Sequence, residues 1–298
     1  MRASFEGALA ALLALALGAA ASACATARNR PVVVASKNFT EQAVLGELLA
    51  QRIERAAHLP VERRFYLAGT YICQQALLSG RVDLYVEYTG TALTAVLKEP
   101  PLPDARQVYE RVRSEYARRW NLAVLPSLGF ENSFAMVVRG EDARRMRSAS
   151  LSESAAYAPG WRLGVGYEFM ERPDGYAGLA QAYGLSFREP PRLMDLGLLY
   201  RALSEKQVDM VAGNSTDGLI SALGLVALAD DKHYFPPYEA VPIVRHQALV
   251  EFPGLRVVLE GLAGRISADD MRRMNYAVDG QHRDAAEVVR LFLKVKGL

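Results

Sequence analysis

The sequence predicts an α/β protein of two lobes, each built on a mostly parallel β-sheet flanked by helices. Three observations predict this fold. The chain has 298 residues, and at about 100–200 residues per domain that length suits two modest lobes. Short apolar or β-branched runs alternate with helical patterns, an order typical of parallel sheets with sites at the carboxyl ends of strands. Two later segments have the pattern of crossovers between the lobes.

The alternation can be followed along the chain. Residues 32–34 are a β-branched run, and residues 40–57 carry apolar side chains at helical spacing. Asn38 or Thr40 is the expected cap of that helix, with Glu41 in its first turn. The strand–helix unit recurs at residues 61–67 and 70–78, 82–86 and 89–97, 162–165 and 175–183, and 208–211 and 217–223. From residue 253 onward the pattern is helical, with amphipathic segments at 271–278 and 285–295.

The two expected crossovers define the lobes. Residues 122–138 contain two β-like stretches, and the stiff segment 235–238 precedes a third, at residues 241–244. If both regions pass between the lobes, the two ends of the chain form one lobe and the middle forms the other. A ligand would then lie in the cleft between them. The predicted division assigns residues 31–134 and 239–298 to the first lobe and residues 135–238 to the second.

The first 23 residues are expected to be a secretory signal peptide. A positive start at Arg2 precedes an Ala- and Leu-rich run that ends in small residues directly before Cys24. A cysteine there resembles a bacterial lipobox, although Ala21 stands where that motif usually carries Leu. We expect a lipid on Cys24, a short tether at residues 24–30 and an extracytoplasmic protein held at the membrane. A retained anchor helix is the alternative.

Composition excludes several classes of protein. The fractions of hydrophobic (51%) and charged (23%) residues are those of a globular chain. The formal net charge of +2 supplies no basic field for a phosphate backbone, so we expect no nucleic-acid partner. Two cysteines cannot build a disulfide framework. Cys73 lies in a helical pattern and is expected to be a buried thiol.

Motifs for catalysis, metals and cofactors are missing from the sequence. The histidines are scattered, without the spacing of metal ligands; they are His58, His233, His246 and His282. Gly164 and Gly166 lack the third glycine of a dinucleotide fingerprint, because Phe169 occupies its place. Asp217 stands where a nucleophile elbow needs glycine, so Ser215 is expected to cap a helix or contact a ligand. We expect no catalytic residue, metal ion or cofactor.

Aromatic residues stand at the ends of predicted elements. Tyr88 follows a strand and precedes a glycine-containing helix start, while Phe134 and Tyr238 fall in the two crossover regions. Rings that converge from both lobes suit a quaternary ammonium group, which has no hydrogen-bond donor and is held by the ring quadrupoles. For each ring, a place in the hydrophobic core is an equal alternative.

Five motifs, in order, resemble the substrate-binding lipoproteins of ABC importers for glycine betaine, choline, carnitine and related osmoprotectants. They are SKNFTEQ (36–42), EYTGT (87–91), YEF with ERPDG (167–175), STDG (215–218) and DDKHYFPPY (230–238). The resemblance runs from about residue 32 to the C-terminus. It implies a type II periplasmic-binding-protein fold with two hinge crossovers, a ligand in the cleft, and delivery to a permease with its ATPase subunits. It implies no catalysis, and we expect a monomer.

The resemblance also implies where the ligand binds. In relatives that bind choline or betaine, an aromatic cage surrounds the trimethylammonium group, and its positions fall on Tyr88, Phe134, Asn214 and Tyr238. Asn214 departs from the aromatic pattern, and Phe134 replaces a tyrosine with another ring. A three-sided cage leaves room for a larger or more polar zwitterion, such as a betaine of an amino acid.

The anionic end of such a zwitterion needs a positive or hydrogen-bonding partner. Lys37 and Thr91 stand at family positions that face the ligand and are expected to meet its carboxylate. Arg172 is a secondary candidate, because Glu168 and Glu171 are near enough in sequence to pair with it. Two other function classes stay open: a sensor or adaptor lobe for a small solute, and an exported enzyme.

Overall fold

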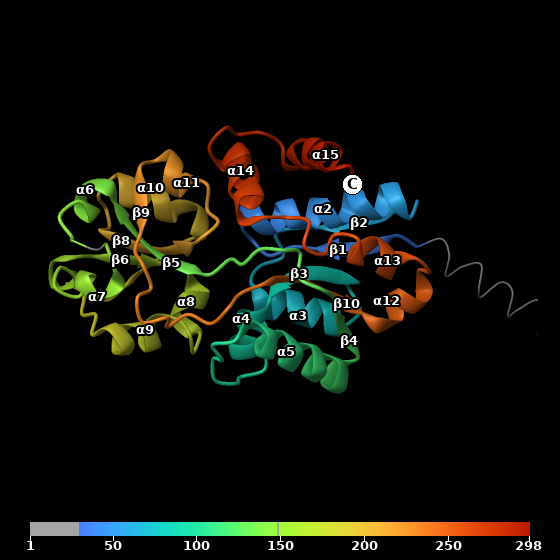
Figure 1. Ribbon diagram of the computed structural model, residues 1–298, viewed down its shortest axis with the longest axis horizontal. Coiled ribbons are helices and arrows are strands. Elements are labelled where there is room, and N and C mark those ends of the chain that lie inside the picture. Colours follow the sequence, from blue (N-terminus) through green and yellow to red (C-terminus); the bar gives the residue numbers. More distant parts are fainter. Residues whose placement is uncertain (1–29, 148) are drawn as a thin grey trace, which may run out of the picture.

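The computed structural model describes residues 30–147 and 149–298. They form two bodies side by side along the long axis, each with a five-stranded sheet between helices (Figure 1). We call the body around the sheet that contains the first strand the first lobe, and the other the second lobe. The expected signal peptide, Cys24 and most of the tether lie outside the described residues.

The first sheet has the strand order β2-β1-β3-β10-β4. Strand β1 pairs in parallel with β2 and β3, whereas β10 is antiparallel to β3 and β4, so four strands share one direction. The strands are β1 (Val32–Ala35), β2 (Val61–Arg64), β3 (Leu84–Tyr88), β4 (Leu122–Val124) and β10 (Ala240–Arg245). All residues of β1 and β3 are buried, as expected for strands covered on both faces.

The helices of the first lobe cover both faces of this sheet (Figure 1). They are α2 (Thr40–Ala56), α3 (Thr70–Leu78), α4 (Thr89–Thr91), η1 (Ala92–Val96), α5 (Ala105–Trp120), α12 (His246–Glu251), α13 (Leu255–Glu260), α14 (Ala268–Asp279) and α15 (Ala285–Lys296). Because strand side chains alternate between faces, Val32 and Val34 pack in the core around α2, and Val33 and Ala35 in the core around α3 and α5.

The second sheet repeats this plan with the order β7-β6-β8-β5-β9. Strand β5 is antiparallel to β8 and β9, while β6 pairs in parallel with β7 and β8. The strands are β5 (Phe134–Arg139), β6 (Leu163–Val165), β7 (Arg192–Leu193), β8 (Met210–Asn214) and β9 (Leu225–Ala227). Around them lie α6 (Gly140–Ala143), α7 (Leu151–Ser154), η2 (Ala158–Gly160), α8 (Tyr167–Glu171), α9 (Tyr176–Tyr183), η3 (Leu196–Leu198), α10 (Leu199–Ser204) and α11 (Leu219–Ala222).

Two chain segments cross between the lobes. One leads from β4 to β5 and the other from β9 to β10. They run antiparallel beside each other, because Glu131 bridges Glu239 and the amide of Asn132 donates to the carbonyl of Tyr238 at 3.0 Å. The two-lobed α/β fold with two crossovers is therefore confirmed. The division of the chain at residues 134 and 238 stays a prediction.

The structure corrects some local expectations. Phe39 is the N-cap residue of α2 and makes no side-chain cap bond. The Thr40 hydroxyl instead donates to Asp279 Oδ1 at 2.5 Å, so neither Asn38 nor Thr40 caps the helix. The region from residue 253 onward, expected to be helical throughout, consists of the three separate helices α13, α14 and α15. Cys73 is fully buried as predicted, and burial raises the pKa of its thiol to about 12.

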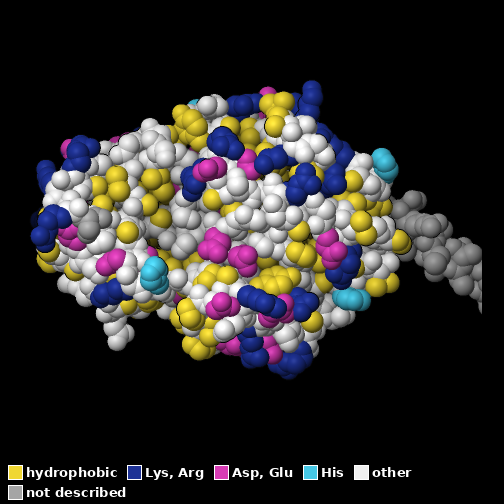
Figure 2. Space-filling model, viewed as in Figure 1, with side chains coloured by type: hydrophobic (Ala, Val, Ile, Leu, Met, Phe, Trp, Pro, Cys, Tyr) yellow, Lys and Arg dark blue, Asp and Glu magenta, His cyan; other side chains and the backbone are white. Residues whose placement is uncertain are grey.

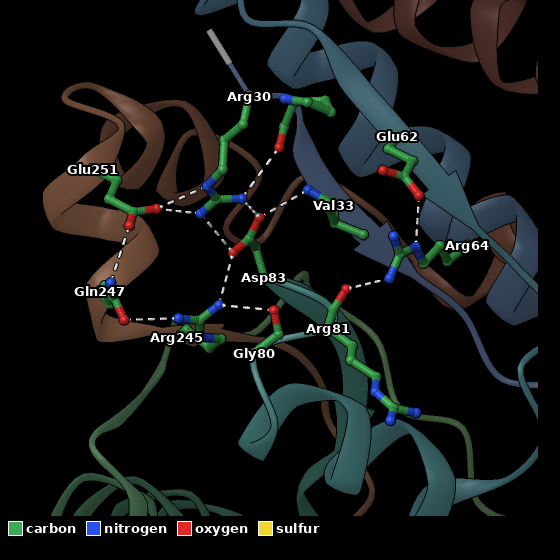
Figure 3. Close-up of polar contacts among 11 residues, drawn as sticks. Arg30, Val33, Glu62, Arg64, Gly80, Arg81, Asp83, Arg245, Gln247 and Glu251 are labelled. Carbon is green, nitrogen blue, oxygen red and sulfur yellow. Dashed lines mark hydrogen bonds and ion pairs between the residues drawn. The ribbon is translucent and has the colours of Figure 1, made fainter. Parts of the chain in front are cut away.

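The first described residue is tied to the first lobe by a polar network (Figure 3). Arg30 Nη1 donates to Asp83 Oδ2 at 2.7 Å and the guanidinium also pairs with Glu251. Asp83 in turn accepts from the amide of Val33 and from Arg245. The chain thus enters the fold at the end of the first lobe that faces away from the second lobe (Figure 1).

Basic and acidic side chains are interspersed over the face shown in Figure 2. This pattern agrees with the small net charge of +2. Within residues 30–147 and 149–298, no helix is both long and apolar enough to cross a membrane.

Candidate functional site: an aromatic cavity between the lobes

A cavity of about 280 Å³ lies between the two lobes. All six residues predicted to contact a ligand line it: Lys37, Tyr88, Thr91, Phe134, Asn214 and Tyr238. The ends of strands bring them together. Lys37 follows β1, Tyr88 ends β3 and Asn214 ends β8, which are carboxyl ends of strands, where α/β folds place their ligands. That these side chains bind a ligand remains a prediction.

Lys37 is held by an ion pair inside the first lobe. Its Nζ lies 2.5 Å from Glu87 Oε1 and 3.2 Å from the hydroxyl of Thr70, and only 3% of the residue is exposed. The same Nζ lies 4.7 Å from the centroid of the Tyr88 ring. A buried charge needs such a partner. A ligand carboxylate here would therefore share the Lys37 ammonium with Glu87.

Glu41 connects both lobes and was missed as a site residue by the sequence argument, which placed it only in a helix turn. Its Oε1 accepts from the Tyr88 hydroxyl at 2.6 Å and from Asn132 Nδ2 at 2.8 Å. Its Oε2 accepts from Asn275 Nδ2 at 3.0 Å and from the hydroxyl of Thr216. Burial raises the pKa of Glu41, and the four donors oppose that rise. The only sequence signal was its place in the SKNFTEQ motif.

Several aromatic rings meet around Phe134, which lines the cavity. The centroid of Phe134 lies 4.8 Å from that of Phe169, 5.7 Å from that of Phe235 and 6.0 Å from that of Tyr238. The Tyr238 hydroxyl donates to Asp174 Oδ2 at 2.5 Å. Core and site were equal alternatives for Tyr88, Phe134 and Tyr238. Tyr238 meets both descriptions, because it is 1% exposed and lines the cavity.

Arg172 lies against two of these rings. Its Cζ is 4.8 Å from the Phe134 centroid and 5.8 Å from that of Tyr238. Its Nε and Nη2 donate to the two carboxylate oxygens of Asp174, at 2.8 and 2.6 Å. Its Nη1 donates to the hydroxyl of Thr91 at 2.9 Å, across to the first lobe. Arg172 is therefore a built part of the cavity wall.

The partner expected for Arg172 was wrong. Asp174 pairs with it, because only this carboxylate presents both oxygens to the guanidinium fork. Although burial disfavours the charged form, Arg172 lowers the pKa of Asp174. Glu168 instead accepts from the amide of Thr70 at 2.7 Å, where α3 begins in the other lobe. A negative charge is favourable at a helix N-terminus.

Asn214 stands directly opposite Phe134 in the β5–β8 ladder. Its backbone amide donates to Asp217 Oδ2 at 2.9 Å, and the Tyr200 hydroxyl donates to the same oxygen at 2.6 Å. Ser215, expected to cap or to contact a ligand, accepts from the amide of Ser133 at 3.1 Å and does not line the cavity. Asn214 thus places a polar side chain opposite Phe134 in the wall of the cavity.

In the described part of the chain, no group of three or more His, Cys, Asp and Glu side chains is arranged to hold a metal ion.

The chain matches known proteins over most of its length. The sequence model of the OpuAC family, the substrate binding domain of ABC-type glycine betaine transport systems, matches residues 30–295. The ergothioneine transport permease/ergothioneine binding protein EgtU of Helicobacter pylori (strain G27) is 33% identical over 271 residues, which cover 91% of this chain and 48% of that protein. The chain therefore spans about half the length of that relative.

A second relative is matched over most of its own length. The carnitine transport binding protein OpuCC of Listeria monocytogenes serotype 1/2a (strain 10403S) is 33% identical over 259 residues, covering 86% of this chain and 83% of that one. The crystal structure of a glycine betaine/carnitine/choline ABC transporter component superposes with a TM-score of 0.74 at 33% identity, covering 89% of this chain and 98% of that chain. The resemblance predicted from the five motifs is confirmed, and so is the fold it implied.

Proposed function

The chain belongs to the family of substrate-binding domains of ABC-type glycine betaine transport systems, and we propose that it captures a quaternary-ammonium zwitterion outside the cytoplasm for delivery to an ABC permease. One observation carries the proposal. Aromatic rings and a buried cation line the same cavity between the lobes. A zwitterion with a methylated ammonium group at one end and a carboxylate at the other matches that arrangement.

The ammonium group would lie among Tyr88, Phe134 and Tyr238, on ring faces other than those against which Lys37 and Arg172 lie. A trimethylammonium ion cannot donate a hydrogen bond, so ring faces recognise it, with about 2 kcal/mol or more for each desolvated contact. The rings also exclude water, which strengthens the electrostatic attraction. Asn214 opposite Phe134 leaves the fourth side open.

The carboxylate would lie near Lys37, Thr91 and Arg172. Lys37 Nζ lies near the Tyr88 ring and the Thr70 hydroxyl as well as the carboxylate of Glu87. The Thr91 hydroxyl accepts from Arg172, so its own proton is available to a ligand oxygen. All three side chains line the cavity.

A thermal-shift screen followed by calorimetry tests this proposal. Glycine betaine, carnitine and ergothioneine should raise the melting temperature, since a ligand bound only by the folded protein stabilises it. Choline keeps the cation but lacks the carboxylate and should bind more weakly than glycine betaine. Glycine is the control that keeps the carboxylate but lacks the methyl groups. If glycine binds as tightly as the methylated compounds, the proposed recognition is wrong.

Closure of the lobes on the ligand is part of the proposal. Contacts that need both lobes, such as Arg172 to Thr91 and Glu168 to Thr70, favour a closed form. Two-lobed receptors commonly respond to ligand by hinge closure. Small-angle scattering should show a smaller radius of gyration with saturating ligand. An unchanged radius with a ligand that demonstrably binds would exclude hinge closure.

We further propose that Cys24 carries the membrane anchor. Arg30 is fixed to the first lobe through Asp83 and Glu251, so only a short stretch separates Cys24 from the folded protein. Stable lipid anchoring needs more than one acyl chain. Cys24→Ala should release the protein from the membrane fraction into the extracytoplasmic fluid. Full membrane retention of that variant would favour an uncleaved helix instead.

The proposed role is that of a monomeric binding protein without catalytic activity. A sensor or adaptor lobe for the same solute is the competing function, and it predicts a signalling protein rather than a permease as partner. Reconstitution with candidate permeases distinguishes them, because only a transport receptor stimulates uptake of labelled ligand into vesicles.

A further inference from the structure

The two short helices α12 and α13 lie beside the point where the described chain begins. Strand β1 starts two residues after Arg30, and α12 follows directly on the last residue of β10. Both helices lie at the end of the first lobe that faces away from the second lobe (Figure 1). We call the exposed surface of residues 246–257, which comprises α12, the connection and the start of α13, the end face.

We propose that the end face lies against the lipid surface in which the chain is anchored. The molecule then stands on its first lobe, with the second lobe turned away from the membrane. This inference rests on the lipid proposed for Cys24, and it adds a contact between the folded protein and the membrane. It describes the receptor between its encounters with a permease.

The short distance along the chain from Cys24 to the fold supports the proposal. Arg30 follows Cys24 by six positions. An extended chain spans at most about 3.6 Å per residue, so this stretch reaches about 20 Å at most. The Arg30 guanidinium is bonded to Asp83 and Glu251 (Figure 3), and its Cζ lies 4.8 Å from the centroid of the Phe252 ring. The anchor is therefore attached directly beside the end face.

Apolar side chains are exposed on the end face. Val250 is 68% exposed and Val257 is 74% exposed, among the most exposed large apolar side chains of the described residues. Pro253 is exposed between them. Figure 2 shows hydrophobic side chains at the end of the molecule from which the grey chain leaves. Such groups are favourable about 5–10 Å inside the boundary between lipid headgroups and acyl chains.

The charges beside the end face also suit a lipid surface. Asp83 pairs with Arg30 and Arg245, and Glu251 pairs with Arg30. Glu260 pairs with Arg256 at 3.0 Å. Because these acids are neutralised by arginine, they do not repel anionic headgroups. Arg256 is itself exposed, next to Val257, and adds attraction to such headgroups.

The small size of the apolar surface is compensated by the tether. Two valines and a proline would hold a free protein to a membrane only weakly. A short tether, however, raises the effective concentration of the attached surface to about the millimolar range, so that a weak contact is populated without any further interaction. The lipid and the end face therefore act as two linked contacts.

Fluorescence quenching in vesicles tests the inference. The lipidated protein carries a fluorescent label on Val257→Cys, or on Leu193→Cys as the matched control, which is 51% exposed in the second lobe. Cys24 carries the lipid, and Cys73 is fully buried with its pKa raised to about 12, so neither should take the label. The vesicles contain phosphatidylcholine and phosphatidylglycerol, with or without bromine on the acyl chains.

We expect bromine to quench the label at residue 257 at least about threefold more than the label at residue 193, since only the former would lie about 5–10 Å inside the headgroup boundary. Val250→Asp should lower the quenching at residue 257 at least about threefold, because a buried charge loses its hydration. Leu223→Asp, at an exposed position of the second lobe, should leave it unchanged. Equal quenching at residues 257 and 193 would overturn the inference.

The outcomes separate this inference from the proposals on which it rests. If mass spectrometry finds no lipid on Cys24 of the membrane-bound protein, the proposed anchor is wrong and the end-face contact is excluded with it. If Cys24 is lipidated but the two labels are quenched alike, only the end-face contact is wrong. Binding of glycine betaine to each labelled variant shows that it is folded and tests the receptor function independently.

Discussion

The two sides of the main cavity are held in different ways. On the first-lobe side, Lys37 and Tyr88 are buried and each is bonded to a carboxylate, Glu87 and Glu41 respectively. On the second-lobe side, Arg172 is also bonded to a carboxylate, Asp174, but Phe134 is held by packing against other rings. We call these the first wall and the second wall. Hydrogen bonds to charged groups fix a side chain in one geometry, whereas ring packing tolerates substitution by other apolar groups.

This difference predicts separate roles for the two walls. The first wall holds the site in one geometry, and the second wall affects which ligand is preferred. The first wall is oriented before a ligand arrives, and such pre-organisation lowers the entropic cost of binding. The second wall includes Asn214, the position that departs from the family's aromatic pattern and that also borders a neighbouring cavity. We therefore expect substitutions in the first wall to affect stability and all ligands, and substitutions in the second wall to affect the choice among ligands.

The largest effect should come from the carboxylate behind the first wall. Glu41→Ala removes the acceptor of four hydrogen bonds and leaves their buried donors without a partner. At about 1–3 kcal/mol for each unsatisfied group, partly recovered by entering water, the free energy of unfolding should fall by about 3 kcal/mol or more. Urea denaturation of the variant and the wild type measures this fall in the free energy of unfolding.

Glu54→Ala is the matched control, because Glu54 lies on the same helix at the surface and pairs with Arg63. Such a surface pair is worth about 0–1 kcal/mol. If the two variants lose the same stability, Glu41 does not hold the first wall.

Tyr88 allows the ring and the hydroxyl to be tested separately. Tyr88→Ala should weaken binding of glycine betaine at least about tenfold, since one cation–π face of about 2 kcal/mol is lost. Tyr88→Phe keeps that face and should bind within about threefold of wild type, while losing about 1 kcal/mol of stability with its bond to Glu41. Calorimetry on the folded variants measures both affinities for glycine betaine. An unchanged affinity in Tyr88→Ala would exclude recognition of the ammonium group by the aromatic ring.

A carboxyl next to Asn214 of the second wall should make stability depend on pH. Burial, with the charges of Glu41 and Asp279, raises the pKa of Asp217 from 3.8 to about 7. A carboxyl with a raised folded-state pKa favours folding below its unfolded pKa, and that contribution is lost as the pH rises through its folded pKa. The wild type should therefore lose stability relative to Asp217→Asn as the pH rises from about 4 to about 8.

Parallel denaturation series at several pH values measure this divergence. Asp269→Asn at the surface of α14 should follow the wild type throughout. A constant difference between wild type and Asp217→Asn across the range would show that Asp217 titrates normally.

The smallest effect is expected in the second wall. Phe134→Leu keeps an apolar side chain against Phe169 and Tyr238 but removes one ring face. Affinity for glycine betaine should fall about threefold, roughly 0.7 kcal/mol, and stability should change by less than about 1.5 kcal/mol. A loss as large as that of Tyr88→Ala would mean that both walls contribute equally and that the comparison does not hold.

The sequence by itself determined the elements and the positions of residues relative to their ends. The range 70–78 is a helix with the predicted bounds, and the residues at the ends of β3 and β8 line the cavity. These features follow from local periodicity, because apolar side chains at a period near 2 or 3.6 specify a strand or a helix together with its buried face. The order of the motifs was enough to identify the family.

Only the tertiary structure decided which side chains are partners. Glu41 receives hydrogen bonds from residues 47, 91, 175 and 234 positions away, and the main cavity is enclosed by segments from both lobes. Nothing in the local sequence specifies such contacts. They depend on how the two lobes face each other across the crossovers, and a hydrogen bond is lost when its atoms are displaced by about 1 Å. A cavity is likewise a property of surfaces that come together only in the folded chain.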